Sequence, residues 1–161
     1  MSAAMTLDIS QLVQLDQIIG RVSAAETRDL MERLGIVAEN AISDNFEGEH
    51  DPDGVPWKPS LRATKQGGKT LTDSGVLATS ITSNATTDSV EAGSNMIYAA
   101  IHNFGGTITR ERSFAMIADL GFTEIKMPQR QFVGWGADAM ADAKAEAEDW
   151  LAELLPPGAL S

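Results

Sequence analysis

The chain has 161 residues, no cysteine and a formal charge of −11. This length fits one domain with its own hydrophobic core, and the lack of cysteine excludes disulfides and thiolate metal sites, so the fold must rest on packing. So acidic a surface repels phosphate groups, which argues against binding to nucleic acid through charge neutralisation.

The charge is distributed unevenly along the sequence. Residues 1–54 carry a net charge of −8, residues 55–135 carry +2 and residues 136–161 carry −5. The amino terminus has neither a basic start nor an apolar stretch, and the longest apolar run, Met96–Ile101, is far shorter than the roughly 20 residues that span a bilayer. We therefore expect a soluble protein that is not exported and has no membrane partner.

Two helices are predicted in the N-terminal third. The apolar residues within Leu7–Ile19 predict a short amphipathic helix, and Ser23 and Glu26 then have the spacing of a capping box. From there to Phe46 apolar residues recur at steps of three and four, which predicts one long helix with Asn45 off its apolar face. The apolar positions are Leu30, Leu34, Val37, Ala38, Ala41, Ile42 and Phe46.

The segment after the long helix is predicted to be an exposed loop. Turn-forming residues at Asp51–Gly54 end the helix, and Trp57 and Leu61 are the only large apolar anchors that follow. Arg62–Lys69 is basic and glycine-containing but lacks the spacing of a phosphate-binding loop. We expect a mobile basic loop suited to docking on an acidic neighbour.

A helical turn and a hairpin are predicted next. Thr72 or Asp73 is expected to cap a short helical turn that runs through Val76 and Leu77 to Ile81. Strand-forming residues then lie on both sides of the turn-forming residues 86–88, which predicts a β-hairpin.

The sequence from Met96 onwards predicts a short helix followed by two strands. Met96–Phe104 is expected to form one or two helical turns that stop at Gly105 and Gly106. Short strands are predicted at residues 107–109 and 123–127, with a loop at residues 110–121 between them.

A second long helix is predicted from Ala137 until Pro156–Gly158 ends it. Its apolar stripe is predicted to contain Met140, Ala143, Ala147, Trp150, Leu151 and Leu154. The order of elements predicts an α+β fold in a single domain over residues 1–161: a small antiparallel sheet with a β-hairpin, packed against the two long helices, N-terminal and C-terminal. Residues 1–22 are assigned to an N-terminal arm.

Catalysis is not expected from this sequence. His50 and His102 are the only imidazoles, and neither lies in a known nucleophile or zinc motif. His102 lies inside an apolar helix, which favours a hydrogen-bonded packing residue over a catalytic base. We therefore predict no catalytic residue and no cofactor.

The acidic turn at residues 47–53 offers a different chemistry. It contains five possible metal ligands, namely Glu47, Glu49, His50, Asp51 and Asp53. Their spacing departs from that of a calcium loop, so a solvated turn is favoured and no metal site is assigned. A metal-dependent hydrolase that uses this turn remains the first alternative function.

Four short motifs follow one another along the chain. They are Phe46 with Pro52–Gly54 and Trp57–Pro59, then Leu71–Leu77 (LTDSGVL), Tyr98–Gly106 (YAAIHNFGG) and Met127–Gly134 (MPQRQFVG). In this order they resemble the phage virion morphogenesis family, the tail-completion proteins of Mu-like and related contractile-tailed phages. Ser74 replaces the family's usual threonine, and Gln131 stands where a proline is expected.

The resemblance covers roughly residues 24–154 and implies an assembly role at the tail end or at the head-tail junction, without enzymatic activity. The residues singled out for an interface or scaffold are Trp57, Tyr98, His102, Phe104, Gly105, Gly106, Pro128, Arg130 and Phe132. Tyr98 and Phe104 are expected to supply buried area. Arg130 is expected to bind a carboxylate of a neighbouring subunit, with a solvated guanidinium or an internal ion pair as the equal alternative.

The resemblance also implies a homo-oligomeric ring around the DNA channel, with a hexamer expected, whose partners are the tail tube or sheath and the neck or connector proteins. Such a protein is located in the virion, and in the host cytoplasm during assembly. Acidic helices that line the lumen would keep the passing DNA from sticking. The second alternative, an acidic DNA mimic that inhibits a host enzyme, fits poorly with aromatic residues between moderately basic loops.

Overall fold

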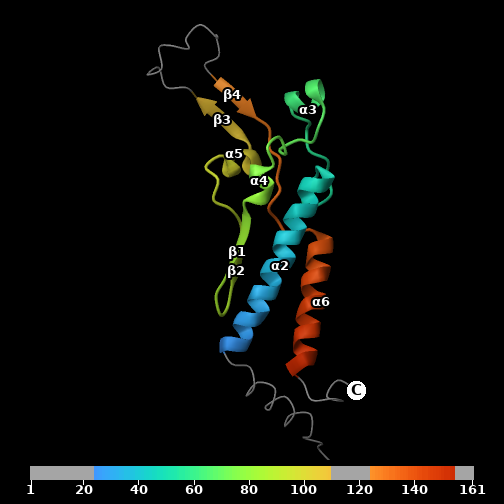
Figure 1. Cartoon of the computed structure of the whole chain (residues 1–161), viewed down its shortest axis with the longest axis vertical. Coiled ribbons are helices and arrows are strands. Elements are labelled where there is room, and N and C mark those ends of the chain that lie inside the picture. Colours follow the sequence, from blue (N-terminus) through green and yellow to red (C-terminus); the bar gives the residue numbers. More distant parts are fainter. Residues whose placement is uncertain (1–23, 110–123, 155–161) are drawn as a thin grey trace, which may run out of the picture.

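The computed structural model describes residues 24–109 and 124–154. The molecule is elongated, with two long helices and a β-hairpin side by side along one half and the other short elements gathered around the other half (Figure 1). The helix predicted at Leu7–Ile19, the cap at Ser23, the loop at residues 110–121 and the stop at Pro156–Gly158 lie outside the described residues.

Helix α2 (Ala24–Gly48) confirms the predicted N-terminal helix. Ala38, Ile42 and Phe46 are buried on its apolar face. The prediction that Asn45 lies off this face is wrong, because Asn45 is 5% exposed and its Nδ2 donates a hydrogen bond of 3.1 Å to the carbonyl of Phe132. A buried amide that is hydrogen-bonded in this way is compatible with the core.

Helix α6 (Ala137–Leu154) confirms the predicted C-terminal helix and packs along α2 (Figure 1). Its buried residues are Ala139 and Trp150, whereas Met140 is 55% exposed, so the predicted stripe is wrong at its first position. Periodicity sets the spacing of an apolar stripe but not its exact rotation, which the packing of α6 on α2 decides. Gly136, just before the helix, allows the chain to approach Pro52 closely, since a Cβ there would lie 1.8 Å from the Pro52 carbonyl oxygen.

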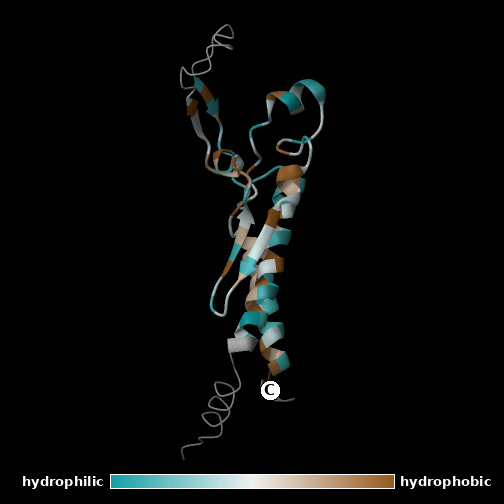
Figure 2. Cartoon of the chain, turned by 60° about the vertical axis from the view of Figure 1, so that its left-hand side comes forward, coloured by the Kyte–Doolittle hydropathy of each residue, from teal (hydrophilic) through white to brown (hydrophobic). Residues whose placement is uncertain are grey.

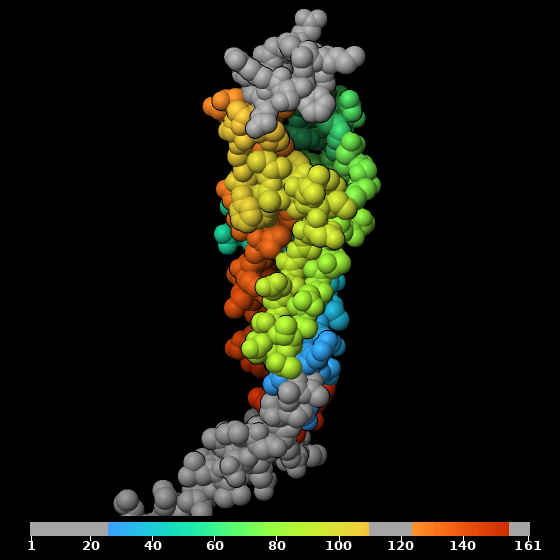
Figure 3. All heavy atoms as spheres, turned by 90° about the vertical axis from the view of Figure 1, so that its left-hand side faces the viewer, coloured from blue at the N-terminus to red at the C-terminus, as the bar shows by residue number. Residues whose placement is uncertain are grey.

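Strands β1 (Ile81–Ala85) and β2 (Val90–Ser94) form the predicted hairpin, with Ile81 opposite Ser94. The hairpin covers α2, and Figure 3 shows it from the solvent side. Gly35 of α2 allows this contact, because a Cβ there would lie 2.7 Å from Ser83 Oγ. Glu39 adds a hydrogen bond, since its Oε1 accepts the backbone N–H of Ser83 at 2.6 Å.

Strands β3 (Gly106–Thr109) and β4 (Glu124–Met127) form the second predicted pair, which is also antiparallel. The α+β class is therefore confirmed. The described strands, however, form two separate two-stranded sheets, and the β1–β2 hairpin is the one that packs extensively on a long helix.

Two short helices differ from the sequence prediction. Helix α3 (Leu61–Gln66) occupies part of the predicted loop, because Ser60 caps it by accepting the N–H of Ala63 at 3.1 Å. Leu61 is 78% exposed and is not an apolar anchor. Helix α4 (Val76–Thr79) begins after Gly75, which has φ = 75°. The expected caps are wrong, and so is the extension of the turn to Ile81, which lies in β1.

The third short helix, α5 (Ala99–Phe104), confirms the helical turn predicted from Met96 and starts three residues later. Tyr98 is its N-cap residue and Gly105, with φ = 68°, is its C-cap residue. The glycine accepts a conformation that is costly for other residues, so the predicted stop at this position is confirmed.

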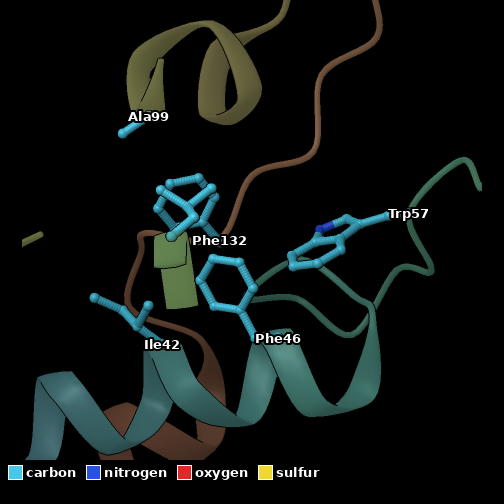
Figure 4. Packing of buried hydrophobic residues seen from close by; sticks show 6 residues of the cluster. Ile42, Phe46, Trp57, Ala99 and Phe132 are labelled. Atoms are coloured by element: carbon cyan, nitrogen blue, oxygen red, sulfur yellow. The ribbon is translucent and has the colours of Figure 1, made fainter. Parts of the chain in front are cut away.

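The core lies where α2 meets the shorter elements. Phe46 packs against Phe132 at a ring-centroid distance of 5.0 Å and edge-on against Trp57 at 5.6 Å (Figure 4). The other buried members of this core are Ile42, Leu77 and Ala99. Figure 2 shows that the long helices carry both apolar and polar residues along their length.

No described helix is long and apolar enough to cross a membrane.

Candidate functional site

The four motifs converge on one groove of about 670 Å³ between α3, α4, α5 and β4 (Figure 1). We call it the motif groove. It is lined by Lys58, Pro59, Ser60, Leu61, Arg62, Leu71, Asp73, Ser74, Leu77, Tyr98, His102, Ile125, Lys126, Met127, Pro128 and Arg130. Segments that are far apart in the sequence thus form one exposed surface.

Trp57 and Phe132 lie in the core beneath the motif groove. Trp57 is 6% exposed and its Nε1 donates a hydrogen bond of 2.8 Å to the carbonyl of Gln131. Phe132 is 1% exposed. These two predicted residues therefore support the groove and do not line it.

Asn45 and Asn103 hold the backbone of Phe132, and the sequence reasoning missed both. Asn45 donates to the Phe132 carbonyl, and Oδ1 of Asn103 accepts the N–H groups of Phe132 at 2.9 Å and Val133 at 3.0 Å. Asn103 is 5% exposed. An amide within the apolar Tyr98–Gly106 tract was the available signal, because such a group needs partners when buried.

His102 lies in the wall of the motif groove next to Tyr98, with ring centroids 6.2 Å apart. Its Nδ1 is buried and has no hydrogen-bond partner among the described residues, so the predicted side-chain hydrogen bond is not found at that atom. Burial lowers the pKa of His102 below its usual value, and the positive charge of Arg130 lowers it further. A neutral imidazole is therefore favoured.

Phe104 is 71% exposed and Tyr98 38%, so the expectation that these two side chains supply buried area is wrong. The reason is the sharp exit at Gly105, where a Cβ would lie 2.7 Å from the backbone nitrogen of Gln129. At Gly106, with φ = 145°, a Cβ would lie 2.9 Å from Ile101 Cδ1. The two glycines let α5 end directly against the last motif.

Arg130 lies at the base of the motif groove and is 5% exposed. Its Nε donates a hydrogen bond of 2.7 Å to the carbonyl of Lys58, and its backbone N–H donates one of 2.8 Å to the carbonyl of His102. No described carboxylate forms an ion pair with it, so neither the solvated guanidinium nor the internal ion pair is present there. Burial lowers the pKa of this guanidinium.

The lining of the motif groove is basic and partly apolar. Pro128 and four cationic residues, Lys58, Arg62, Lys126 and Arg130, line the groove together with a single carboxylate, that of Asp73. This carboxylate is already paired with Arg62 Nε at 3.4 Å. Leu71, Leu77 and Ile125 supply apolar contact area between the charges. Such a surface suits a ligand that combines negative charge with aliphatic groups.

The acidic turn is tied up in its own hydrogen bonds. Glu49 Oε2 accepts the N–H of Thr70 at 2.7 Å, and Asp51 Oδ1 accepts the N–H groups of Asp53 at 3.0 Å and Val55 at 2.8 Å. Within residues 24–109 and 124–154 no three His, Asp or Glu side chains form a group that could hold a metal ion. The alternative of a metal-dependent hydrolase therefore has no geometric support in this turn.

Comparison with known proteins points to tailed phages. The chain is 30% identical over 115 residues to the Mu-like prophage FluMu G protein 2 of Haemophilus influenzae, an alignment that covers 70% of this chain and 78% of that protein. No solved structure gives a significant match. The sequence profile of the phage virion morphogenesis family matches residues 8–153, so the match begins before the first of the four motifs. Because it covers most of the sequence, the chain belongs to the phage virion morphogenesis family.

Proposed function

We propose that this protein is a non-enzymatic structural subunit that completes the phage tail or forms part of the neck between tail and head. The family supports a structural or assembly role in the particle. The observation that carries the proposal is the convergence of all four motifs on the exposed motif groove. Motifs needed only for folding would be expected in the core, as Trp57 and Phe132 are.

The subunits are proposed to close into a ring, with a hexamer expected. The elements that line the groove lie toward one end of an elongated molecule, and the two long helices extend away from them (Figure 1). When two different surfaces of one chain meet, each copy can bind a neighbour on both sides, and such a contact generates a closed ring or an open filament.

The acidic charge of the long helices suits a DNA channel. Helix α6 alone carries six acidic side chains and one lysine. Acidic residues of α2 and α6 that are not used in subunit contacts would repel DNA that passes through the ring. The basic lining of the motif groove argues against a DNA mimic, because a mimic of DNA presents negative charge to the enzyme that it inhibits.

Assembly is tested with purified protein by sedimentation velocity and negative-stain microscopy over a range of concentrations, with and without purified phage tails. We expect ring-shaped oligomers, in solution or on tail ends. A protein that stays monomeric even with tails present contradicts ring formation.

The place in the particle is tested genetically. Mass spectrometry of purified virions is expected to detect the protein, and particles made without its gene are expected to show tails of abnormal length or tails that fail to join heads. Normal infectious particles without the gene would contradict the assembly role itself.

A further inference from the structure

Arg130 is a buried cation without a counter-ion in the described chain. The residue is 5% exposed and its Nε donates a hydrogen bond to the Lys58 carbonyl, while no described carboxylate forms an ion pair with it. Burying a charge without a partner is costly, so such a group is expected to be paired in the functional state. Because Arg130 lines the motif groove, an outside ligand has access to it.

The groove around Arg130 identifies the chemistry of this ligand. A guanidinium presents a planar fork of donors that matches a carboxylate. Lys58 and Lys126 add positive charge, and Leu77 and Tyr98 add apolar surface, so the ligand carries carboxylates on a partly aliphatic segment. A nucleic acid is a poor occupant, because the whole chain has a charge of −11.

Helix α6 carries a row of unpaired aspartates that fits this description. Asp138, Asp142 and Asp149 fall on one face of the helix, since their spacings of four and seven residues follow its period. All three are exposed, and none forms a hydrogen bond or ion pair with another described residue. The glutamates of α6 differ, because Glu146 and Glu153 bind Arg33 and Glu148 binds Lys144.

Small side chains lie between these aspartates. Ala141, Ala145 and Ala152 are exposed on the same face of α6. Alanines allow the helix backbone to approach a partner closely, so a short aspartate side chain can reach the base of a groove. Together, these three aspartates and three alanines define the aspartate row.

We propose that the motif groove of one subunit receives the aspartate row of a second copy of this chain, with one of the aspartates bound to Arg130. None of the residues of the row lines the groove of its own subunit, so the contact joins two different surfaces. It therefore runs in one direction from copy to copy, as a ring requires. This inference rests on the proposed ring assembly and identifies the contact that builds the ring.

Cross-linking tests the contact directly. The chain has no cysteine, so Ser74→Cys in the groove and Ala145→Cys in the row provide the only two thiols of a double variant. A short bismaleimide is expected to give a ladder of covalent dimers and higher oligomers. The matched control is Ser74→Cys with Thr87→Cys at the exposed hairpin turn, which is expected to stay monomeric. Equal ladders from both variants, or a ladder from the control alone, overturn the proposal.

Charge substitution tests the energetics without disturbing buried Arg130. Asp138→Asn with Asp142→Asn is expected to raise the concentration for half-assembly at least tenfold. The matched control, Glu47→Gln with Glu91→Gln, changes the net charge by the same amount and is expected to leave the concentration for half-assembly unchanged. Lys58→Glu with Lys126→Glu is expected to block assembly, and the addition of Asp138→Lys with Asp142→Lys is expected to restore it. Circular dichroism checks that each variant is folded.

The outcomes separate the two proposals. If the parent protein forms rings and the aspartate variants form them equally well, the proposed contact is wrong and the ring stands. If the parent protein never assembles, in solution or on tails, ring formation itself is contradicted and the contact is rejected with it.

Discussion

The backbone N–H of Phe132 donates a hydrogen bond of 2.9 Å to the side-chain oxygen of Asn103. This bond joins the Tyr98–Gly106 tract to the last motif. The Phe132 carbonyl is held from the other side by Asn45 of α2. The Tyr98–Gly106 tract therefore holds the backbone beneath the motif groove through the side chain of Asn103, and the neighbouring His102 lies in the groove wall.

Asn103→Ala is expected to destabilise the protein. The substitution leaves the N–H groups of Phe132 and Val133 buried without an acceptor, and each such loss costs about 1–3 kcal/mol. Urea unfolding is expected to show a loss of about 2–4 kcal/mol. Asn40→Ala, an exposed position of α2, is the control and should change stability by less than about 0.5 kcal/mol. Similar losses in both variants would show that the amide is not important.

Phe132→Ala and Phe104→Ala are expected to differ sharply, although both remove a phenyl ring from a motif. Phe132 is 1% exposed in the core, so its removal should cost about 3–5 kcal/mol. Phe104 is 71% exposed, and its removal should cost less than about 0.5 kcal/mol. Thermal or urea unfolding measures both. A large loss for Phe104→Ala would place that ring in the core.

Gly105→Ala is expected to cost more stability than Gly54→Ala. Both glycines have positive φ, 68° and 80°, and alanine in this region is disfavoured by about 1–2 kcal/mol. At Gly105 the new Cβ would also lie 2.7 Å from Gln129 N, whereas at Gly54 it meets nothing within 4 Å. The difference in unfolding free energy measures this clash. Equal losses would mean that Gln129 moves aside freely.

His102 should make stability fall in mild acid. Because its pKa is lowered in the folded state, the unfolded chain binds a proton at His102 more readily than the folded chain does. Above about pH 6.5, the ordinary pKa of histidine, both states are neutral and His102 contributes nothing. As the pH falls below this value, the melting temperature should decline.

The control for this effect is His102→Gln, which removes the titration and keeps a polar side chain. Its melting temperature should decline less than that of the parent between pH 7 and pH 5. Parallel declines would mean that the pKa of His102 is not lowered.

Much of the fold was predictable because it depends on local periodicity. The three-and-four spacing gave α2 and α6, the turn residues gave the β1–β2 hairpin, and the paired glycines gave the end of α5. The predictions that failed depend on contacts between distant segments. Asn45 is buried because Phe132 is there to accept its hydrogen bond, and the packing of α6 on α2 places Ala139 inside and leaves Met140 exposed.

The candidate site shows the same division. The segments that line the motif groove are recognisable in the sequence as motifs, and Arg130 belongs to the last of them. That no described carboxylate pairs with Arg130 is a fact of three-dimensional arrangement, since the sequence does not show which acidic residues lie near it. Asn103 was missed because the sequence does not show which of two neighbouring polar residues, His102 or Asn103, is buried and hydrogen-bonded to the backbone of a distant segment.

The sequence by itself determined the class of fold, the order of the elements and the family, because these follow from residue periodicity, turn chemistry and short motifs. Only the tertiary structure decided that the four motifs line one groove, that Phe104 is exposed, and that Arg130 is buried without an ion pair to any described carboxylate. These properties depend on which distant side chains come within a few ångströms of each other, and that is decided by packing.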